Sequence, residues 1–505
     1  MKLKEPLLLL AIVGLGAATL GAAENPPTEI ESLKRQLQQA QDAFEKAMRE
    51  QRQVIESMSR KIQELETAQR GPGASLTNPP PILAAPAATL TNPPTATTAS
   101  TIPAFTPSPT ATAGVTPAPW SPTDPIRIGR AGQAYLDLSF DALIDAGWST
   151  ASDPGAYLNL GAHDPRNRGF SIPDAEISIV GAVDPYFKAV VDIGFSVDGN
   201  GDTGVELEDA YLMTSDLPWN LQARAGEIYA NFGRQNTQHA HAWDFVDQPI
   251  ILNRTMGPDG LRNPGAQINW LAPLPVFTEL SLGIFNGAGE TAFSYRNLGE
   301  EGPLGGTEIH GRRTQDYGMN GPGDLLYVPR VAVSFDLTPN QTVVAGVSAG
   351  FGANDTGPSQ YTRVYGFDLY WKWKSPRANK GFPFVSWQTE GAYQVFEAGS
   401  DPVAGLPSEN LRDYGFYSQV LWGFKPRWVV GLRGEWANGN QAIFDPNDVY
   451  RGERIRVSPN LTWYVSEFSK IRLQYNYDYG HNFGVANSIW LQLEFLLGAH
   501  AAHRF

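Results

Sequence analysis

The sequence predicts an all-β protein, a sixteen-stranded antiparallel β-barrel that spans a membrane, preceded by an α-helical coiled coil and a disordered linker. Three observations predict the barrel. About sixteen segments of roughly ten residues alternate apolar and polar side chains, the connections alternate between long and short, and the last segment, 487–505, carries the alternation to the terminal Phe505. A period of two is that of a strand with one apolar face, and this length and even number are typical of membrane barrels.

The composition agrees with an envelope protein. The 505 residues include 51 Gly, 13 Trp, 19 Tyr and 24 Phe and no Cys, and the formal net charge is −14. Strands that face lipid on one side only do not produce a strongly apolar average, so the mean hydropathy of −0.27 is compatible with a barrel. The negative charge argues against a nucleic-acid partner.

Residues 1–23 have the features of a secretory signal peptide. Lys2 and Lys4 form a basic start, and an apolar core at 7–20 is too short to span a membrane and remain there. Small residues end the segment, so we expect cleavage after Ala23. An uncleaved anchor is the alternative.

Two further segments precede the barrel. In 24–70, apolar residues from Ile30 to Leu65 recur at a and d positions of one heptad frame, with polar residues elsewhere. We expect a periplasmic coiled coil there, and a helix packed on its own domain is the alternative. Residues 71–124 are rich in Pro, Thr and Ala and have little to bury, which predicts an extended linker before a barrel at 125–505.

The connections within 125–505 indicate a barrel inserted from one side, with tight periplasmic turns and long outer loops. Short turns are expected at positions such as Asp184-Pro185 and Leu217-Pro218, and the stretch Ser375 to Gly381 is longer than this pattern requires. The long connections are 148–171, 234–264, 287–325, 397–411 and 438–452.

Three stretches carry a resemblance to a known family. They are Val205 to Tyr211 (VELEDAY), Ala225 to Gly233 (AGEIYANFG) and Leu496 to Phe505 (LLGAHAAHRF). The region from Ile126 onward resembles the phosphate-selective porin O/P family of outer-membrane porins. The resemblance implies a sixteen-stranded homotrimer in outer-membrane lipid with its third loop folded into the pore. It also implies that Phe505 is a signal read by the barrel-assembly machinery, and that lumenal Arg and Lys select anions.

Charged residues at inward-facing strand positions divide by sign along the chain. Because strand order maps onto position around the wall, we expect an acidic arc and a basic arc, and such arcs tune which ions pass. Mutual ion pairs are the alternative role. The acidic arc is Asp137, Asp141, Glu176, Asp192, Glu206 and Glu208, and the pore-lining or anion-contact candidates are Arg224, Arg254, Arg262, Arg330, Arg433, Arg454, Arg456, Lys470 and Arg472.

The loop 234–264 contains a dense polar cluster. His239 and His241 with Asp244 are candidate ligands of a divalent metal. Arg254 and Arg262 are candidate anion contacts through charge-assisted hydrogen bonds. A structural plug held by hydrogen bonds and ion pairs is the alternative.

These patterns predict a porin in the outer membrane of a Gram-negative-type bacterium, with its N-terminal segment in the periplasm. The expected function is passive diffusion of small hydrophilic solutes, anions such as phosphate among them, without a cofactor. No HExxH or P-loop motif is present, and Gly346 to Gly350 (GVSAG), which matches GxSxG, lies within an alternating strand segment, so we predict no enzyme activity. The alternative is a plugged barrel acting as an envelope tether, with the coiled coil on peptidoglycan or a periplasmic partner, or as a metal-related receptor through the loop 234–264.

Overall fold

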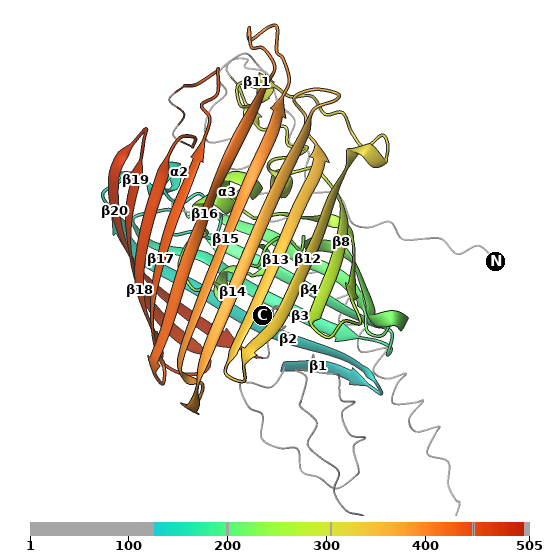
Figure 1. Cartoon of the computed structure of the whole chain (residues 1–505), viewed down its shortest axis with the longest axis vertical. Helices are drawn as coiled ribbons and strands as arrows, with labels where there is room; N and C mark the ends of the chain where they lie inside the picture. The colour runs from blue at the N-terminus through green and yellow to red at the C-terminus, as the bar shows by residue number, and fades with distance from the viewer. Residues whose placement is uncertain (1–125, 198–200, 303–305, 447, 449, 499–505) are drawn as a thin grey trace, which may run out of the picture. The chain divides into compact units, whose positions relative to one another are not determined.

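The computed structural model describes residues 126–498, apart from 198–200, 303–305, 447 and 449 (Figure 1). The predicted signal peptide, coiled coil and linker and the terminal Phe505 lie outside the described residues. Among the described residues, no helix is long and apolar enough to cross a membrane.

The described chain forms one antiparallel sheet of 17 strands, of which sixteen close into a barrel. Each strand pairs with its neighbours in sequence, β20 pairs with β2 to close the ring, and β8 pairs with β12 across the longest loop. The additional strand β1 (Ile126–Ala131) pairs only with the start of β2. The barrel strands are β2 (Ala134–Ser149), β3 (Gly169–Ala182), β4 (Phe187–Val197), β5 (Thr203–Thr214), β6 (Leu221–Tyr229), β7 (Arg262–Leu271), β8 (Phe277–Asn286), β12 (Leu325–Thr338), β13 (Gln341–Ala353), β14 (Tyr361–Asn379), β15 (Phe382–Ala398), β16 (Glu409–Lys425), β17 (Trp428–Gly439), β18 (Arg454–Tyr464), β19 (Ser469–Gly480) and β20 (Gly484–Leu497).

The two faces of the barrel wall reverse the pattern of a water-soluble protein. In β19, Leu473 points outward with 45% of its surface exposed, whereas the neighbouring Arg472 and Gln474 point inward and are buried. Leu473 lies opposite Leu491 of β20, and Arg472 lies opposite Gln492. An exposed apolar face is stable only where the surroundings are themselves apolar, so the outward face is a lipid-facing surface.

Aromatic side chains on this outward face gather near both ends of the strands. Near the short turns, Trp428 stacks on Trp463 with ring centroids 5.7 Å apart. Near the long loops, Tyr365 stacks on Tyr393, with centroids 6.5 Å apart. Bands of aromatic residues at the two membrane interfaces are typical of membrane barrels.

A charge on the lipid-facing surface should therefore destabilise the barrel according to its depth. Leu473→Arg, near the middle of β19, should lower the free energy of unfolding in lipid vesicles by about 2–4 kcal/mol. Val485→Arg, at the outward-facing second residue of β20, should cost about 0–1 kcal/mol because it lies near an interface. Equal costs at the two positions would contradict a membrane location for this face.

The connections alternate between short turns at one end and long loops at the other, as expected. The expectation of a longer connection at Ser375 to Gly381 was wrong, because β14 continues to Asn379 and β15 begins at Phe382. Lys380 and Gly381 make the turn, and both have positive φ, as two-residue hairpin turns of the right twist require. The polar residues at the end of β14 remain in the strand because both faces of the sheet are exposed to water at this end of the barrel.

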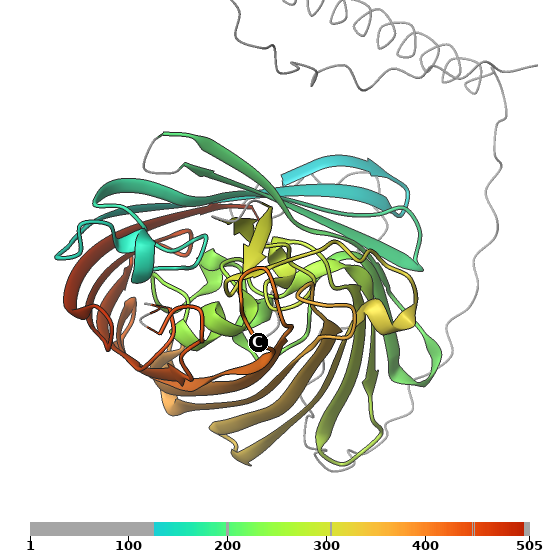
Figure 2. The same ribbon diagram turned by 90° about the horizontal axis from the view of Figure 1, so that it is seen from above.

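The connection between β6 and β7, residues 230–261, folds into the barrel instead of extending outward, and we call it loop 3 (Figure 2). It contains two short 3₁₀ helices (Gln235–Thr237 and Ala240–Ala242) and the helix α3 (Ile250–Met256). Ile250, Ile251, Leu252 and Met256 of α3 are buried in an apolar cluster with residues of β15, β16 and β17. This apolar contact anchors the C-terminal half of loop 3 to the wall.

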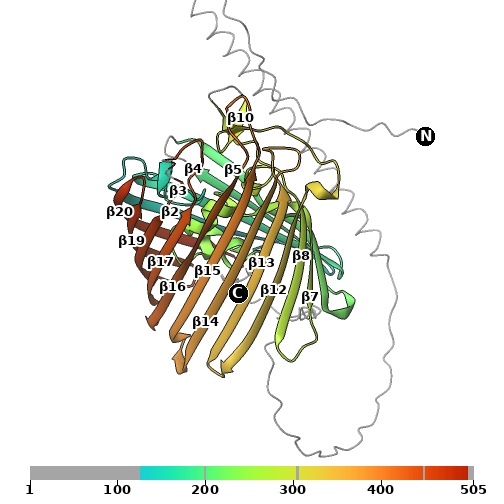
Figure 3. The ribbon, with the colours of Figure 1, turned by 45° about the horizontal axis from the view of Figure 1, so that its top comes forward.

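The remaining long loops cover the same end of the barrel. Loop 4, between β8 and β12, carries a small sheet of β9 (Glu300–Glu301), β10 (Thr307–Ile309) and β11 (Arg312–Arg313) (Figure 3). Arg312 is fully buried and donates to the carbonyls of Gly399 and Pro407 in the loop after β15. The connection between β2 and β3, residues 150–168, is called loop 1 and contains the single turn α2 (Pro154–Tyr157).

Candidate functional site

Loop 3 lies between two oppositely charged parts of the barrel wall. The predicted acidic residues come from β2 to β5, and the predicted basic residues of the late strands come from β17 to β19. Loop 3 presents histidines to the first group and aspartates to the second. The site is therefore the contact of this loop with the wall.

The histidine half of loop 3 meets the acidic wall. His239 Nδ1 lies 2.7 Å from Glu176 Oε2 and 3.0 Å from Glu208 Oε2, and its Nε2 lies 3.3 Å from Asp209 Oδ2. His241 Nδ1 lies 3.3 Å from Asp141 Oδ2. Burial lowers the pKa of His239, but the surrounding carboxylates outweigh it and raise this pKa well above its usual value. The ring is thus a cation that donates from both nitrogens.

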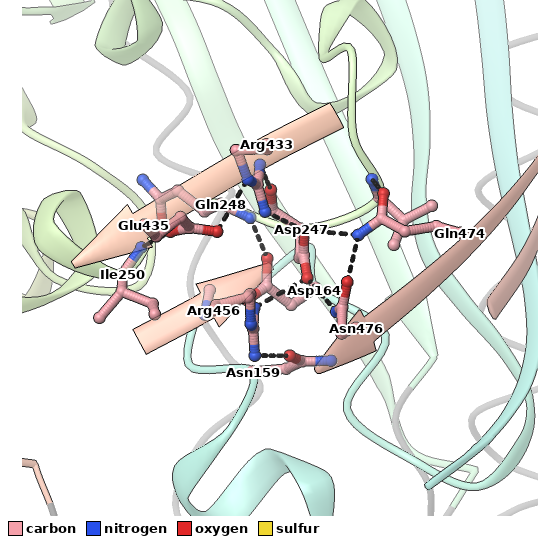
Figure 4. A network of polar contacts seen from close by, with 12 residues as sticks. Asn159, Asp164, Asp247, Gln248, Ile250, Arg433, Glu435, Arg456, Gln474 and Asn476 are labelled. Carbon is pink, nitrogen blue, oxygen red and sulfur yellow. Dashed lines mark hydrogen bonds and ion pairs between the residues drawn. The ribbon is translucent and has the colours of Figure 1, made fainter. Parts of the chain in front are cut away.

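The aspartate half of loop 3 meets the basic wall (Figure 4). Asp247 pairs with Arg433 through one carboxylate oxygen, and its other oxygen lies 2.8 Å from Arg456 Nη1. Gln474 and Asn476 of β19 also donate to it, at 3.0 and 2.7 Å. Each guanidinium is about 1% exposed, and a buried charge is stable only when it is paired and hydrogen-bonded in this way.

Loop 1 completes this network from the opposite side. Asn159 Oδ1 and the Leu158 carbonyl each accept from Arg456 Nη2 at 2.8 Å. Asp164 Oδ1 accepts from the Gln248 backbone N–H at 2.7 Å, which joins loop 1 directly to loop 3. Burial and the neighbouring charge of Asp247 raise the pKa of Asp164 to about 6.

The nine predicted anion contacts are all bonded to protein groups. Arg262 is the first residue of β7 and pairs with Glu206, and Arg254 of α3 donates to the Gly452 carbonyl at 2.8 Å. This arrangement matches the alternative role of mutual ion pairs. The other partners are Gln267 for Arg224, Asp368 for Arg330, Asp247 and Glu435 for Arg433, Asp478 for Arg454 and Arg456, Glu494 for Lys470, and Gln492 for Arg472.

The structure does not bring together the three predicted metal ligands. His239 and His241 face different carboxylates of the acidic wall, whereas Asp244 accepts from Gln419 Nε2 of β16 at 3.1 Å. Among the described residues, Asp244 belongs to no group of three or more possible ligands. Loop 3 turns between His241 and Asp244, and sequence spacing alone carries no information about that turn.

Two cations that sequence reasoning did not select remain partly exposed inside the barrel. The guanidinium of Arg234 in loop 3 lies 4.1 Å from the ring centroid of Tyr370 and donates to Gln388 at 3.1 Å. Lys372, two residues along β14 from Tyr370, is half-buried and near enough to Arg234 and Asp244 for their charges to interact. Lys372 occupies an inward position of an alternating strand, and this position could have identified it as a pore-lining residue from the sequence.

Comparisons with known proteins find a similar sequence and similar structures. No protein-family model matches the chain. An uncharacterized protein of Aquifex aeolicus (strain VF5) is 29% identical over 381 residues, covering 70% of this chain and 74% of that protein. The outer membrane channel DcaP of Acinetobacter baumannii is 11% identical with a TM-score of 0.47, covering 72% of this chain and 97% of its own. An anion-selective porin from Comamonas acidovorans is 8% identical with a TM-score of 0.46, and the match covers 72% of this chain and 100% of that porin.

Proposed function

We propose that the protein is an outer-membrane porin through which small hydrophilic solutes diffuse passively. One observation carries this proposal: a closed barrel has an apolar outward face with two aromatic bands and an inward face made of charged and amide side chains. A polar interior sealed from lipid by a closed sheet is the arrangement of a water-filled channel. We place the short turns in the periplasm and the long loops outside, and a homotrimer is the expected assembly.

Loop 3 is the constriction of this channel. Its contacts with both charged walls keep it at the middle of the barrel, where inward side chains such as Gln474, Asn476 and Trp490 are fully buried. Solutes would pass beside the loop, on the side where Arg234, Tyr370 and Lys372 remain partly exposed. Arg234 and Lys372 face the carboxylate of Asp244 there, while Glu390 beside Arg234 is buried, so the proposed channel prefers anions, and phosphate is a candidate solute.

The test is planar-bilayer conductance of the folded protein in a KCl gradient. We expect discrete steps, a reversal potential on the anion side and block of the chloride current by phosphate. Arg234→Gln and Lys372→Gln should each move the reversal potential toward cations. Lys188→Gln is the matched control, because Lys188 is also half-buried and inward but lies on β4, away from this pair. A cation preference in the wild type would refute the anion proposal and keep the porin.

A plugged barrel is the second candidate. The specific observation in its favour is the complete burial of the network of Asp247, Arg433 and Arg456 between loop 3 and the wall. A barrel held shut by this network would act as an envelope tether or a receptor. Correctly folded protein that shows no conductance would support this candidate against the porin.

A further inference from the structure

A third histidine lies against the acidic wall, and its surroundings differ from those of His239 and His241. His163 of loop 1 has its Nδ1 3.1 Å from the Pro173 carbonyl oxygen. A carbonyl only accepts, so Nδ1 carries the hydrogen and donates it. In the neutral ring, Nε2 then presents a lone pair, and fixing the tautomer through the other nitrogen is the usual way in which proteins prepare a histidine to bind a metal.

The groups that face Nε2 are carboxylates. Glu208 Oε1 lies 3.8 Å from His163 Nε2, which is too long for a hydrogen bond. The possible ligand atoms of His163, Asp174 and Glu208 all lie within 4.8 Å of one another, and all three residues are buried. Ligands bind Zn²⁺ at about 2.0–2.2 Å, so two ligand atoms of one ion lie roughly 3–4 Å apart. The 3.8 Å between His163 Nε2 and Glu208 Oε1 lies in this range.

Asp174 of β3 is the independent observation that indicates a ligand here. It is 1% exposed, and neither of its carboxylate oxygens has a hydrogen-bond partner among the described residues. The same is true of Glu208 Oε1. Burying a carboxylate without a hydrogen-bond partner is strongly unfavourable, so a cation bound here would stabilise these oxygens.

A small cavity adjoins the cluster. Its volume is about 10 Å³, the size of one water-sized sphere, and its lining includes His163, His239 and Asp259. His239 itself is a poor ligand, because both of its nitrogens already lie within 3.3 Å of carboxylate oxygens. Within the described part of the chain, only one nitrogen of His163, Nδ1, makes a hydrogen bond, which it donates to the Pro173 carbonyl. The cavity therefore offers room for one water beside His163.

We propose that His163, Asp174 and Glu208 bind one divalent transition-metal ion, and that Zn²⁺ is the ion this donor set fits. One imidazole and two carboxylates with a water complete a tetrahedral shell, and imidazole favours Zn²⁺ over Mg²⁺ or Ca²⁺. The ligands come from loop 1, β3 and β5, so the ion joins loop 1 to the wall. Because Asn159 and Asp164 of loop 1 contact Arg456 and loop 3, the ion would also hold the loops in place. Binding does not depend on the proposed transport.

The experiment measures Zn²⁺ alone on the full chain, folded in detergent micelles and stripped with EDTA. Equilibrium dialysis with metal analysis should give one Zn²⁺ per chain, and Co²⁺ in its place should show the visible absorption of a tetrahedral site. His163→Gln and Asp174→Asn should each weaken binding by about tenfold or more. Heat-modifiable migration on SDS gels checks that each variant is folded.

Two controls keep the assignment specific. His310→Asn alters a half-buried histidine of loop 4, and His241→Gln alters the other acidic-wall histidine of loop 3; both should retain binding. Zn²⁺ should also raise the unfolding temperature of the wild type and not that of His163→Gln, so the proposal can be judged even if Asp174→Asn does not fold. Absence of stoichiometric binding, or loss of binding in His241→Gln but not in His163→Gln, would overturn it.

Discussion

Replacing Asp247 by Asn should open the barrel. The carboxylate of Asp247 joins loop 3 to Arg433 and Arg456, and the amide cannot balance two buried guanidinium charges. Removing one partner of a buried ion pair costs about 3–5 kcal/mol when the other charge is left uncompensated, and we expect a smaller cost here because Arg433 keeps Glu435 and Arg456 keeps Asp478. Loop 3 would leave this part of the wall, so we expect a several-fold larger single-channel conductance and faster proteolysis within loop 3.

Asp137→Asn is the matched control for this prediction. It makes the same chemical change in an ion pair whose partner, Arg127 of β1, is largely exposed. Exposed pairs contribute about 0–1 kcal/mol, so conductance and stability should stay near those of the wild type. If Asp247→Asn behaves like this control, loop 3 is held by α3 and its apolar contacts instead of by the charge network.

Replacing His239 by Asn should also have a large effect. The charged ring is shared by Glu176, Glu208 and Asp209, and Asn keeps a donor but removes the charge. Buried carboxylates would then repel one another without a cation between them, at a cost of about 3–5 kcal/mol. We expect a lower midpoint of unfolding in denaturant and release of the first half of loop 3, measured by proteolysis.

The pH dependence of this contribution has a definite sign. A histidine whose pKa is raised in the folded state stabilises fully below its unfolded pKa, near 6.5, and the contribution is lost as the pH rises through the folded value. The wild type should therefore lose stability on the alkaline side, and His239→Asn should lose less there.

His310→Asn is the control for His239→Asn. Burial lowers the pKa of His310 to about 3, with Arg451 and Arg312 adding to the effect, so its ring is neutral at pH 7. The substitution removes a half-buried imidazole without removing a charge. If both variants lose equal stability, the charge of His239 does not hold loop 3.

Most of the wall could be predicted from the sequence. The alternation in β19 assigned Leu473 to the outside and Arg472 to the inside, and the alternating connections identified one end of the barrel for the long loops. The same reasoning failed at Ser375 to Gly381. Polar residues occur both at the ends of membrane strands and in turns, so the sequence pattern did not distinguish the end of β14 from a longer connection. The division of charge between early and late strands was also visible, since inward positions follow from the period of two.

The site could be predicted only as a set of candidates. The charged residues of the loop 234–264 identify it as a candidate site. A plug held by ion pairs is one interpretation of these residues, and a site for a metal or for anions is the other. The pairings themselves were not accessible: Asp247 and Arg433 are 186 residues apart in sequence, and His239 is 63 residues from Glu176. Arg456 was a candidate anion contact, yet it is enclosed by Asp247, Asp478 and loop 1.

The sequence by itself determined a closed wall with an apolar outside and a charged inside, because strand faces depend on a local period of two and on the solvent each face meets. Only the tertiary structure decided which inward charges meet which residues of loop 3. That choice depends on the register of sixteen strands around the barrel and on the path of a loop without regular alternation. It gave the predicted anion contacts partners within the protein, and it brought Asp174 and His163 together at the proposed metal site.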